Sequence, residues 1–434
     1  MLKKIFLSLL IISVVSTFFS IISAQEPPKS FDILCHNVHM TVATKGEGGD
    51  VTQSWLNQTG VENINWQSLS TDPLHERFFR EAALKKTDTD VVFLVNPYLM
   101  PQVAAMLEPL DDYIKSNPIE GFPEDFSKGM LSAMTFNGKL YGIPVRHATS
   151  SLHYNEELFK ERGLEGPPNT IEEFFDYAKK LTYTRSDGTE VIGFAIGLMG
   201  GVTNGVDLAR AWDGDVLTTD FEVVCNEPPM VKALTMLRDL YSEGAFPKTF
   251  STLDNVTINT WMQTGRAAMT FSSIGRTTFY NDPDQGSRFP GKIKVAPIPI
   301  SEELIDKIKI ASPKTEFWCM AIPKNAEHKN LSWSFIKHLS TYESALAMAL
   351  NGNGPARMSV YDNPTFKSKC LYADLEKKLL EIARIPFPAF KKAPQGSDIA
   401  SQEFERAILG VKTPQEAMDD LAEELKDLLK ESGL

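Results

Sequence analysis

The run Val91-Val92-Phe93-Leu94-Val95 is the stretch from which the fold class is predicted. It is short, contains no polar residue and is rich in β-branched side chains, which is typical of a strand covered on both faces of a parallel sheet. The turn-forming residues Asn96-Pro97-Tyr98 follow at once and indicate that the strand ends there. Since such a strand needs helices on both sides, the run predicts an α/β architecture.

Two capping boxes predict helices further along the chain. Thr170-Ile171-Glu172-Glu173 precedes four apolar residues at helical spacing. Thr413-Pro414-Gln415-Glu416 opens a last amphipathic helix, with proline at its first position. Residues 140–145 and 151–155 read as two strands that flank an irregular polar stretch. Because no repeat or low-complexity tract interrupts this alternation, we expect two lobes without a flexible linker.

Composition excludes some classes of partner. The 434 residues are 42% apolar and 23% charged, which is typical of a globular chain with a large core. Lysine and arginine number 44 and aspartate and glutamate 56, so the formal net charge is −12. A surface of that sign repels phosphate backbones, and nucleic acid is therefore not expected as a partner.

Residues 1–24 have the order of a cleavable signal peptide. Lys3 and Lys4 precede an apolar stretch over residues 5–22, and Ser23-Ala24 provide small residues before the polar Gln25. Serines and a threonine interrupt the stretch, which favours a signal over a retained membrane anchor. We expect cleavage after Ala24 and a mature chain in the periplasm, without a lipid anchor because no cysteine stands at the cut.

The cysteines and histidines do not form a metal motif. Cys35, Cys225, Cys319 and Cys370 are spaced too widely for a zinc knuckle. An oxidising compartment permits none, one or two disulfides among them, and buried free thiols remain an alternative. His36 and His39 converge only if a turn follows the first strand, so no metal site is predicted.

Catalytic motifs are incomplete. Residues 286–293 match a phosphate-binding loop until Ile293, which lacks the hydroxyl that binds magnesium. Residues 75–79 lack the second histidine of a zinc protease helix, and no nucleophile elbow occurs. We therefore expect no catalytic residue and no cofactor. A secreted glycoside hydrolase is the remote alternative, because its two carboxylates need to be near each other only in space.

Several local strings occur in a characteristic order. They are Asp90-Val91-Val92-Phe93-Leu94 with Leu107-Glu108-Pro109-Leu110-Asp111, Asn137-Gly138-Lys139-Leu140-Tyr141-Gly142-Ile143-Pro144 with Leu152-His153-Tyr154-Asn155-Glu156-Glu157-Leu158-Phe159, Gly265-Arg266-Ala267-Ala268-Met269, and Gly354-Pro355-Ala356-Arg357-Met358-Ser359-Val360-Tyr361. In order and spacing they resemble extracellular solute-binding protein family 1, the maltose-binding class of ABC-importer receptors. The resemblance covers nearly the whole chain after residue 24.

The resemblance implies two α/β lobes that close on a solute in the cleft between them. By analogy the first lobe comprises residues 25–145 and 295–345, and the second residues 146–294 and 346–434. The crossings are expected near Pro144, near residues 295–297 and near residue 345. The resemblance also implies a monomeric receptor, not an enzyme, that delivers a carbohydrate or related polar solute to an inner-membrane ABC permease. Within this division Cys225 and Cys370 share the second lobe, so this pair is expected to meet before any cross-lobe pair.

A sugar cleft needs polar groups for the hydroxyls and aromatic rings for the C–H faces. At the positions that match the family's cleft, the resemblance implies the ligand-binding candidates Asn37, His39, Trp66, Asn96, Tyr98, Arg146, His147, Trp212, Asp213, Ser273, Arg276 and Arg357, with Phe387 or Phe390 as a further aromatic. Arg357 follows a polar, glycine-rich turn. We expect it to be exposed and to contact the solute only when the lobes close.

One departure from the family affects the expected solute. Where the family places a sugar-stacking tryptophan after Gly265-Arg266-Ala267-Ala268-Met269, this chain continues Thr270-Phe271-Ser272-Ser273. The missing ring weakens an oligosaccharide assignment. Guanidinium groups bind carboxylate and phosphate in bidentate fashion, so the arginines also suit an anionic solute such as a glycerophosphate-type ester or a sugar acid. They equally donate to sugar hydroxyls, and both solute classes stay open.

Overall fold

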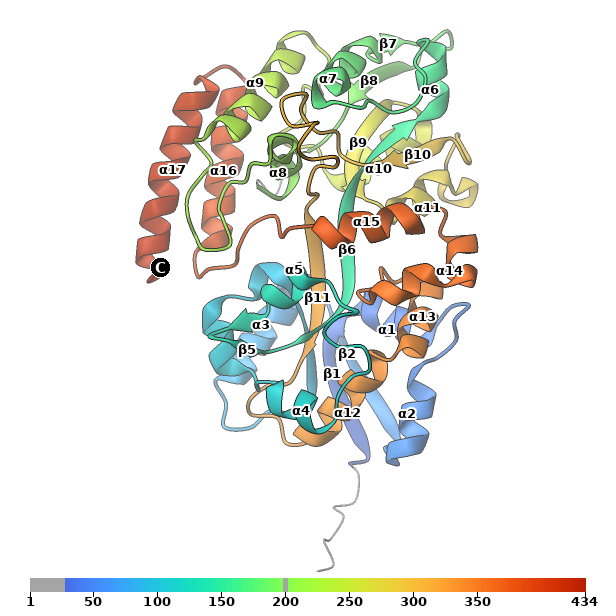
Figure 1. Cartoon of the computed structure of the whole chain (residues 1–434), viewed down its shortest axis with the longest axis vertical. Helices are drawn as coiled ribbons and strands as arrows, with labels where there is room; N and C mark the ends of the chain where they lie inside the picture. Colours follow the sequence, from blue (N-terminus) through green and yellow to red (C-terminus); the bar gives the residue numbers. More distant parts are fainter. Residues whose placement is uncertain (1–27, 198–201) are drawn as a thin grey trace, which may run out of the picture.

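A mixed sheet of nine strands extends through both halves of the described chain (Figure 1). The computed structural model describes residues 28–197 and 202–434, so the expected signal peptide lies outside the described residues. The strand order is β2 (Asn63–Leu69), β1 (Ser30–His36), β3 (Val91–Val95), β11 (Thr315–Ala321), β6 (Ile143–Asn155), β9 (Ala267–Ser273), β8 (Glu190–Phe194) and β7 (Tyr183–Thr184), with β10 (Ile293–Ala296) on β6. A separate hairpin joins β4 (Thr135–Phe136) to β5 (Lys139–Leu140).

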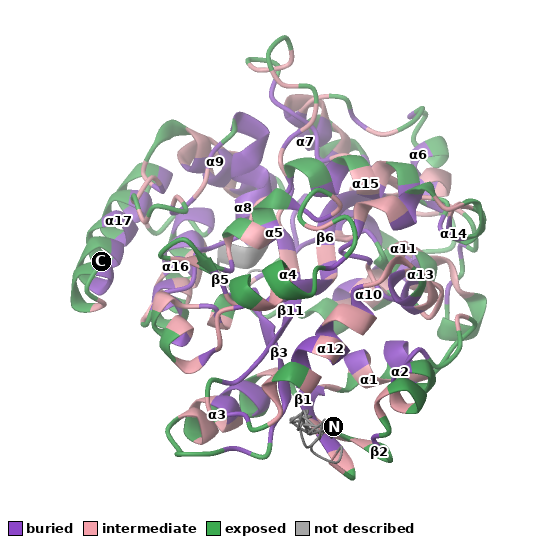
Figure 2. Cartoon of the chain, turned by 60° about the horizontal axis from the view of Figure 1, so that its bottom comes forward, coloured by how far each residue is buried: buried purple, intermediate pink, exposed green. Residues whose placement is uncertain are grey.

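The predicted central strand is confirmed. All five residues of β3 are buried, and Figure 2 shows the strand inside the surrounding helices. It pairs in parallel with β1 but antiparallel with β11. The sheet is therefore mixed, although the expectation of a strand covered on both faces holds.

One long strand replaces the two that the sequence suggested over residues 140–155. β6 continues through its polar centre because that centre is hydrogen-bonded on both edges. Ala148 and Thr149 pair with Glu316 and Thr315 of β11, and Ser150 pairs with Ser273 of β9. Ladder partners on both sides thus maintain extended backbone where the side chains alone suggest a loop.

The first lobe surrounds a core built from β1, β3, β11 and the first part of β6. Its helices are α1 (Asn37–Thr44), α2 (Thr52–Thr59), α3 (Thr71–Ala82), α4 (Asp111–Ser116), α5 (Lys128–Ser132), α12 (Lys329–Leu339), α13 (Tyr342–Leu350), α14 (Pro364–Lys369) and α15 (Ala373–Ile382). Short 3-10 turns add η1 (Asn96–Tyr98), η2 (Pro101–Met106) and η5 (Met358–Asp362).

The second lobe has its own core around β8, β9 and the last part of β6. Its helices are α6 (Glu156–Glu161), α7 (Ile171–Lys180), α8 (Val202–Ala209), α9 (Pro228–Ser242), α10 (Asn255–Thr264), α11 (Arg276–Asn281), α16 (Ala393–Ile408) and α17 (Pro414–Glu431), with the 3-10 turns η3 (Arg210–Trp212) and η4 (Pro283–Gln285). The Thr413 capping box is complete, with Glu416 as its partner. At Thr170 only half of the predicted box is present: the Thr170 side chain accepts from the Glu173 N–H, but the Glu173 carboxylate accepts from the Asn169 N–H instead.

The chain crosses between the cores at places that differ from two of the three expected. The first core ends at Val145 and the second begins at Leu152, which agrees with a crossing just after Pro144. The second core then extends to Ala311, so the crossing expected at residues 295–297 lies near residue 314. The first core extends to Leu380, so the crossing expected near residue 345 lies near residue 384.

These corrections follow from packing that the sequence pattern does not encode. β10 adds to β6 inside the second lobe, and α13, α14 and α15 contribute to the first core. By packing, the lobes therefore comprise residues 31–145 with 317–380, and residues 152–311 with 387–429. Cys370 lies in the first core and Cys225 in the second, which contradicts their expected meeting. All four cysteines are buried and free, as the alternative held.

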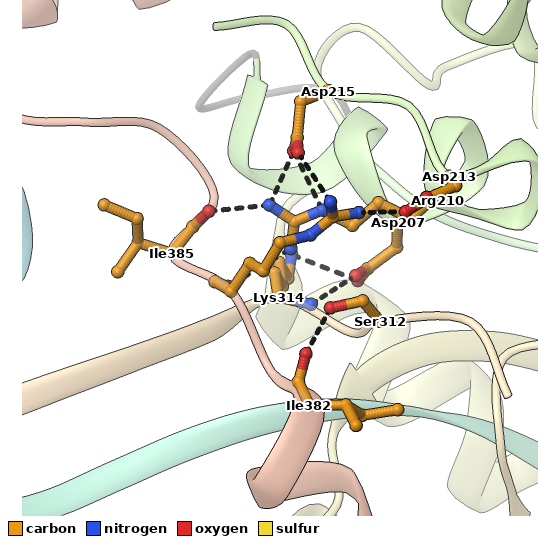
Figure 3. A network of polar contacts seen from close by, with 9 residues as sticks. Asp207, Arg210, Asp213, Asp215, Ser312, Lys314, Ile382 and Ile385 are labelled. Atoms are coloured by element: carbon orange, nitrogen blue, oxygen red, sulfur yellow. Dashed lines mark hydrogen bonds and ion pairs between the residues drawn. The ribbon is translucent and has the colours of Figure 1, made fainter. Parts of the chain in front are cut away.

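The second and third crossings are joined to each other and anchored to the second lobe (Figure 3). The Thr315 N–H donates to the Arg384 carbonyl at 2.9 Å, and the Arg384 N–H donates to the Pro313 carbonyl at 3.0 Å. The buried Arg210 donates to the carbonyls of Arg384 and Ile385. Asp207 accepts from the backbone N–H of Lys314 at 2.8 Å. Hydrogen bonds with Arg210 and Asp207 therefore tie both crossing segments to the second lobe.

Candidate functional site

A cavity of about 740 Å³ lies where the two lobes meet, beside the crossing segments of β6 and β11. That volume falls within the range of roughly 300 to 1,000 Å³ typical of small-molecule sites. It is lined by His36, Val38, Thr71, Arg146, His147, Ala148, Ser273, Gly275, Arg276, Thr278, Glu316, Trp318, Ala349, Leu350, Gly352, Asn353, Gly354, Phe366, Lys369, Cys370, Tyr372 and Glu376. Residues of both lobes contribute to this lining.

The wall from the first lobe combines a ring with polar groups. Trp318 of β11 has its ring centroid 5.9 Å from that of His36, the residue that joins β1 to α1. The His36 Nδ1 atom accepts from the Val38 N–H, which caps α1. Asn353 is held by donating to the Val145 carbonyl at 2.8 Å, and its Oδ1 accepts from Arg146 at 3.2 Å.

The wall from the second lobe is formed where β9 ends and α11 begins. Ser273 is the last residue of β9, and Arg276 and Thr278 lie in the first turn of α11. The backbone here is fixed by the Ile274 N–H, which donates to the Thr149 carbonyl of β6 at 2.8 Å. Arg276 is exposed, so its guanidinium is available to a bound molecule.

Charges of both signs line the cavity. Burial lowers the pKa of Arg146, although a guanidinium keeps its charge in proteins. Glu316 lies two residues before Trp318 on β11, and burial raises the pKa of its carboxyl against the opposing effect of Lys314 and Arg146. Lys369 is paired with Glu47. Arg146 and Arg276 are thus the guanidinium groups of the cavity lining.

The remaining side of the cavity is formed by α15 and the segment before it. Tyr372 and Glu376 line it, and burial raises the pKa of the Glu376 carboxyl to about 8. His147, which also lines the cavity, has its Nδ1 2.9 Å from the Thr149 hydroxyl and its Nε2 2.7 Å from the Tyr361 hydroxyl. Burial lowers the pKa of His147 to about 3, so this imidazole is neutral.

The sequence pattern of the bacterial extracellular solute-binding proteins matches residues 53–373 of the chain. The chain belongs to this family. The resemblance of the local strings is confirmed, and so are the two-lobed α/β fold and the role as the solute-binding protein of an ABC importer.

Known proteins similar to this solute-binding protein include curated relatives and solved structures. The sn-glycerol-3-phosphate-binding periplasmic protein of Pectobacterium atrosepticum is 27% identical over 312 residues, which cover 68% of this chain and 67% of the relative. Maltose-bound MalE3 of T. maritima superposes with a TM-score of 0.74 at 22% identity, covering 92% of this chain and 99% of that one. MalE of Xanthomonas citri superposes with a TM-score of 0.77 at 20% identity, covering 93% of this chain and 98% of that one. These two structures support the fold.

Four of the predicted site residues line the cavity of this solute-binding protein. They are Arg146, His147, Ser273 and Arg276. Asn37 is exposed between the lining residues His36 and Val38 and is not itself part of the lining.

The other predicted residues of the first lobe support the site from behind or lie in the core. His39 is buried between the rings of Phe93 and Trp318, at centroid distances of 4.6 and 4.7 Å. Trp66 packs against Phe335. Asn96 accepts from the Phe317 N–H at 3.0 Å, and Tyr98 stacks on His75 with centroids 3.8 Å apart. None of these four lines the cavity.

The predicted residues of the second lobe divide in the same way. Trp212 is buried in the core, and so are Phe387 and Phe390. Asp213 forms an ion pair with Arg384 at 3.1 Å, at the third crossing. The cavity lining includes none of them.

Arg357 is structural, contrary to the expectation of an exposed cleft residue. It is buried in the first lobe, where its Nε atom lies 2.6 Å from an Asp125 oxygen. It also donates to the carbonyls of Ser340 and Glu120, at 2.7 Å each. The turn before it is polar because Asn353 binds Arg146 and Val145, not because the turn is free in solvent.

Sequence reasoning missed Trp318, Glu316, Asn353, Tyr372 and Glu376. Glu316 was detectable in principle, because a charged residue directly precedes the apolar run that begins at Phe317. Glu376 carries no such signal, since an acidic residue on an amphipathic helix is ordinarily solvated. The described residues contain no group of three metal-ligating side chains and no helix long and apolar enough to cross a bilayer.

Proposed function

We propose that this solute-binding protein captures a carbohydrate or polyol in the 740 Å³ cavity and delivers it unchanged to an ABC permease. One observation carries the proposal: both lobes contribute polar groups to one cavity. Ser273 and Arg276 come from the second lobe, whereas His36 and Asn353 come from the first. A solute that contacts both walls stabilises the closed arrangement over an open one, which is the differential contact that closure requires.

The lining suits a small polyhydroxylated molecule. Arg146, Arg276 and Asn353 supply donors for hydroxyl oxygens, and Glu316 supplies an acceptor. Trp318 offers a ring for a C–H face in place of the tryptophan that the family places after residue 269. Ribitol, mannitol and tagatose are bound by structural neighbours of the same fold, and solutes of that size match the cavity.

An anionic solute is the second candidate. Arg146 and Arg276 line the same cavity, and guanidinium groups bind phosphate or carboxylate through paired hydrogen bonds. The curated relatives at 26 to 27% identity are glycerol-3-phosphate-binding proteins. For this second candidate the solute is a glycerophosphate-type ester or a sugar acid.

The cellular setting follows from the family and the signal-like start. The relatives are periplasmic, and we propose that this chain is exported with cleavage after Ala24, remains free of a lipid anchor and works as a monomer with an inner-membrane permease. In this role it is a receptor without catalytic residues or cofactor. A secreted glycoside hydrolase would instead turn over its ligand.

A ligand screen on the mature chain tests the proposal. Thermal shift against maltose, ribitol, mannitol, tagatose, sn-glycerol 3-phosphate and gluconate identifies binders, since a ligand at a hundred times its Kd adds about 2.7 kcal/mol of stability. Calorimetry then measures each Kd, and chromatography of the released ligand checks that it is intact. Stabilisation by a sugar, polyol or their anionic derivatives is expected. Binding of none of them, or release of a cleaved product, would overturn the proposal.

A further inference from the structure

Glu376 is a carboxyl in the cavity wall that neither solute class requires. It projects from α15, is 4% exposed, and is one of two carboxyls in the lining, the other being Glu316. A buried carboxylate is costly unless a positive group or several donors face it. The charges around Glu376 therefore decide whether its carboxyl is ionised or neutral when a solute binds.

The nearest basic group supplies no charge. The Nε2 atom of His147 lies 3.9 Å from a Glu376 oxygen. Both ring nitrogens of His147 are already within hydrogen-bond distance of hydroxyls, those of Thr149 and Tyr361. Because burial holds this imidazole neutral, it does not compensate an ionised Glu376.

The other elements packed against α15 add one permanent cation that faces Glu376, Arg146 of β6. Arg146 also faces Glu316 and donates to Asn353, so it is shared. Tyr361 of η5 and Cys370 and Tyr372 before α15 are uncharged, and burial raises the pKa of each. The Tyr361 hydroxyl also hydrogen-bonds to Glu376 and, together with Arg146, opposes the rise in the Glu376 pKa that burial causes. The charged groups of α14, α5 and α15 itself are paired elsewhere or exposed: Lys367 with Asp374, Lys369 with Glu47, Lys377 with Asp362, and exposed Lys128, Lys378 and Glu381.

We propose that Glu376 is a specificity-determining residue that meets the bound solute as an uncharged carboxylic acid, so that capture is linked to one proton held by this residue. The inference rests on the proposed binding cavity. A closed cleft excludes water, and loss of water favours the neutral form of a carboxyl. As an acid Glu376 donates its O–H to a solute oxygen, whereas an ionised Glu376 would also repel a phosphate or carboxylate.

The linkage has a definite sign and pH window. Burial raises the pKa of Glu376 to about 8 in the chain without ligand. For the linkage to hold, solute binding must raise this pKa further. Above that value binding requires a proton to be taken up, so the Kd rises by up to about tenfold per pH unit. The neutral histidines and the buried Cys370 and Tyr372 keep their charge state between pH 7 and 9.5, because their pKa values are displaced away from this range.

Two measurements test the proposal. In the ligand-free protein, carbon-13 NMR of labelled glutamate carboxyls as a function of pH gives the titration midpoint of Glu376. The Glu376→Gln variant assigns the resonance. In parallel, calorimetry with sn-glycerol 3-phosphate, ribitol and maltose gives the Kd of each binder from pH 7 to 9.5 for the wild type, Glu376→Gln and Glu316→Gln. The glutamine at 376 imitates the protonated acid, and Glu316→Gln is the matched control at the other carboxyl.

A Glu376 midpoint well above that of ordinary glutamates is expected, with a wild-type Kd that rises above pH 8 and a flat profile in Glu376→Gln. The profile of Glu316→Gln should keep its slope even where its affinity changes. An ordinary midpoint, or a slope that disappears in Glu316→Gln instead, would overturn the inference. If none of the three probes binds, the proposed solute classes fail, and the Glu376 midpoint alone decides this inference.

Discussion

The Arg210 guanidinium donates a 2.6 Å hydrogen bond to the carbonyl oxygen of Ile385, so a side chain of the second lobe holds the backbone of the third crossing. The same guanidinium binds Asp215 at 2.7 and 2.9 Å and is 1% exposed. These bonds tie the third crossing to the second lobe.

Replacement of Arg210 by methionine should destabilise the fold by about 3 to 5 kcal/mol, because it leaves Asp215 without one of its two arginine partners and two carbonyls unpaired. Urea unfolding measures the change. Arg406→Met, which breaks a pair whose arginine is 47% exposed, is the matched control and should cost less than about 1 kcal/mol. Equal losses in the two variants would show that Arg210 is not an anchor.

Arg357→Ala should lower stability and leave solute affinity unchanged. The substitution leaves the Asp125 carboxylate and the carbonyls of Ser340 and Glu120 without their donor, a loss of about 3 to 5 kcal/mol. Thermal unfolding and calorimetric titration at a temperature where the variant is folded separate the two effects. A weakened Kd with an unchanged melting temperature would restore Arg357 to the binding site.

Arg276→Ala should weaken solute binding and leave stability nearly unchanged. The side chain is exposed in the cavity, so its removal costs little packing, whereas the loss of one charged donor to the solute costs about 1.5 to 3 kcal/mol. That loss corresponds to a Kd roughly ten to a hundred times larger. Calorimetry with a solute found in the screen checks this, with Arg288→Ala, outside the lining, as the control. An unaltered Kd in Arg276→Ala would exclude the residue from the site.

The contribution of Glu376 to the free energy of unfolding should fall as the pH rises from about 5 to 8. Burial raises the pKa of Glu376 to about 8, so the folded chain keeps a proton that the unfolded chain loses near its ordinary pKa. The stabilisation that Glu376 contributes therefore decreases with pH across this window, by on the order of a few kcal/mol. The difference between wild type and Glu376→Gln in urea unfolding isolates the effect. A difference that does not vary with pH would contradict it.

The four cysteines should remain free thiols in the native protein. Cys225 and Cys370 lie in different cores, and burial raises the pKa of Cys35 to about 11 and that of Cys319 to about 12, which keeps the reactive thiolate scarce. Mass spectrometry after alkylation should find no native modification and four labels after unfolding, with the same melting temperature with and without a reductant. A peptide linked through Cys225 and Cys370 would refute the core assignment.

The amino-acid sequence by itself determined the local elements and the family. The β3 run is buried as predicted, the Thr170 cap begins α7, and the Thr413 capping box begins α17. These features depend on neighbours within a few residues, which a sequence displays directly. Arg146, His147, Ser273 and Arg276, which line the cavity, were predicted because they lie near strings that the family shares.

Only the tertiary structure decided the chain crossings and half of the site. Arg146 meets Asn353 across 207 positions of sequence, and Glu376 enters the cavity because α15 contributes buried apolar residues to the first core. Arg357 shows the same principle in reverse, since Asp125, far away in the sequence, converts an apparent surface arginine into a buried one. Burial and charge pairing depend on which segments meet, and local side-chain periodicity does not carry that information.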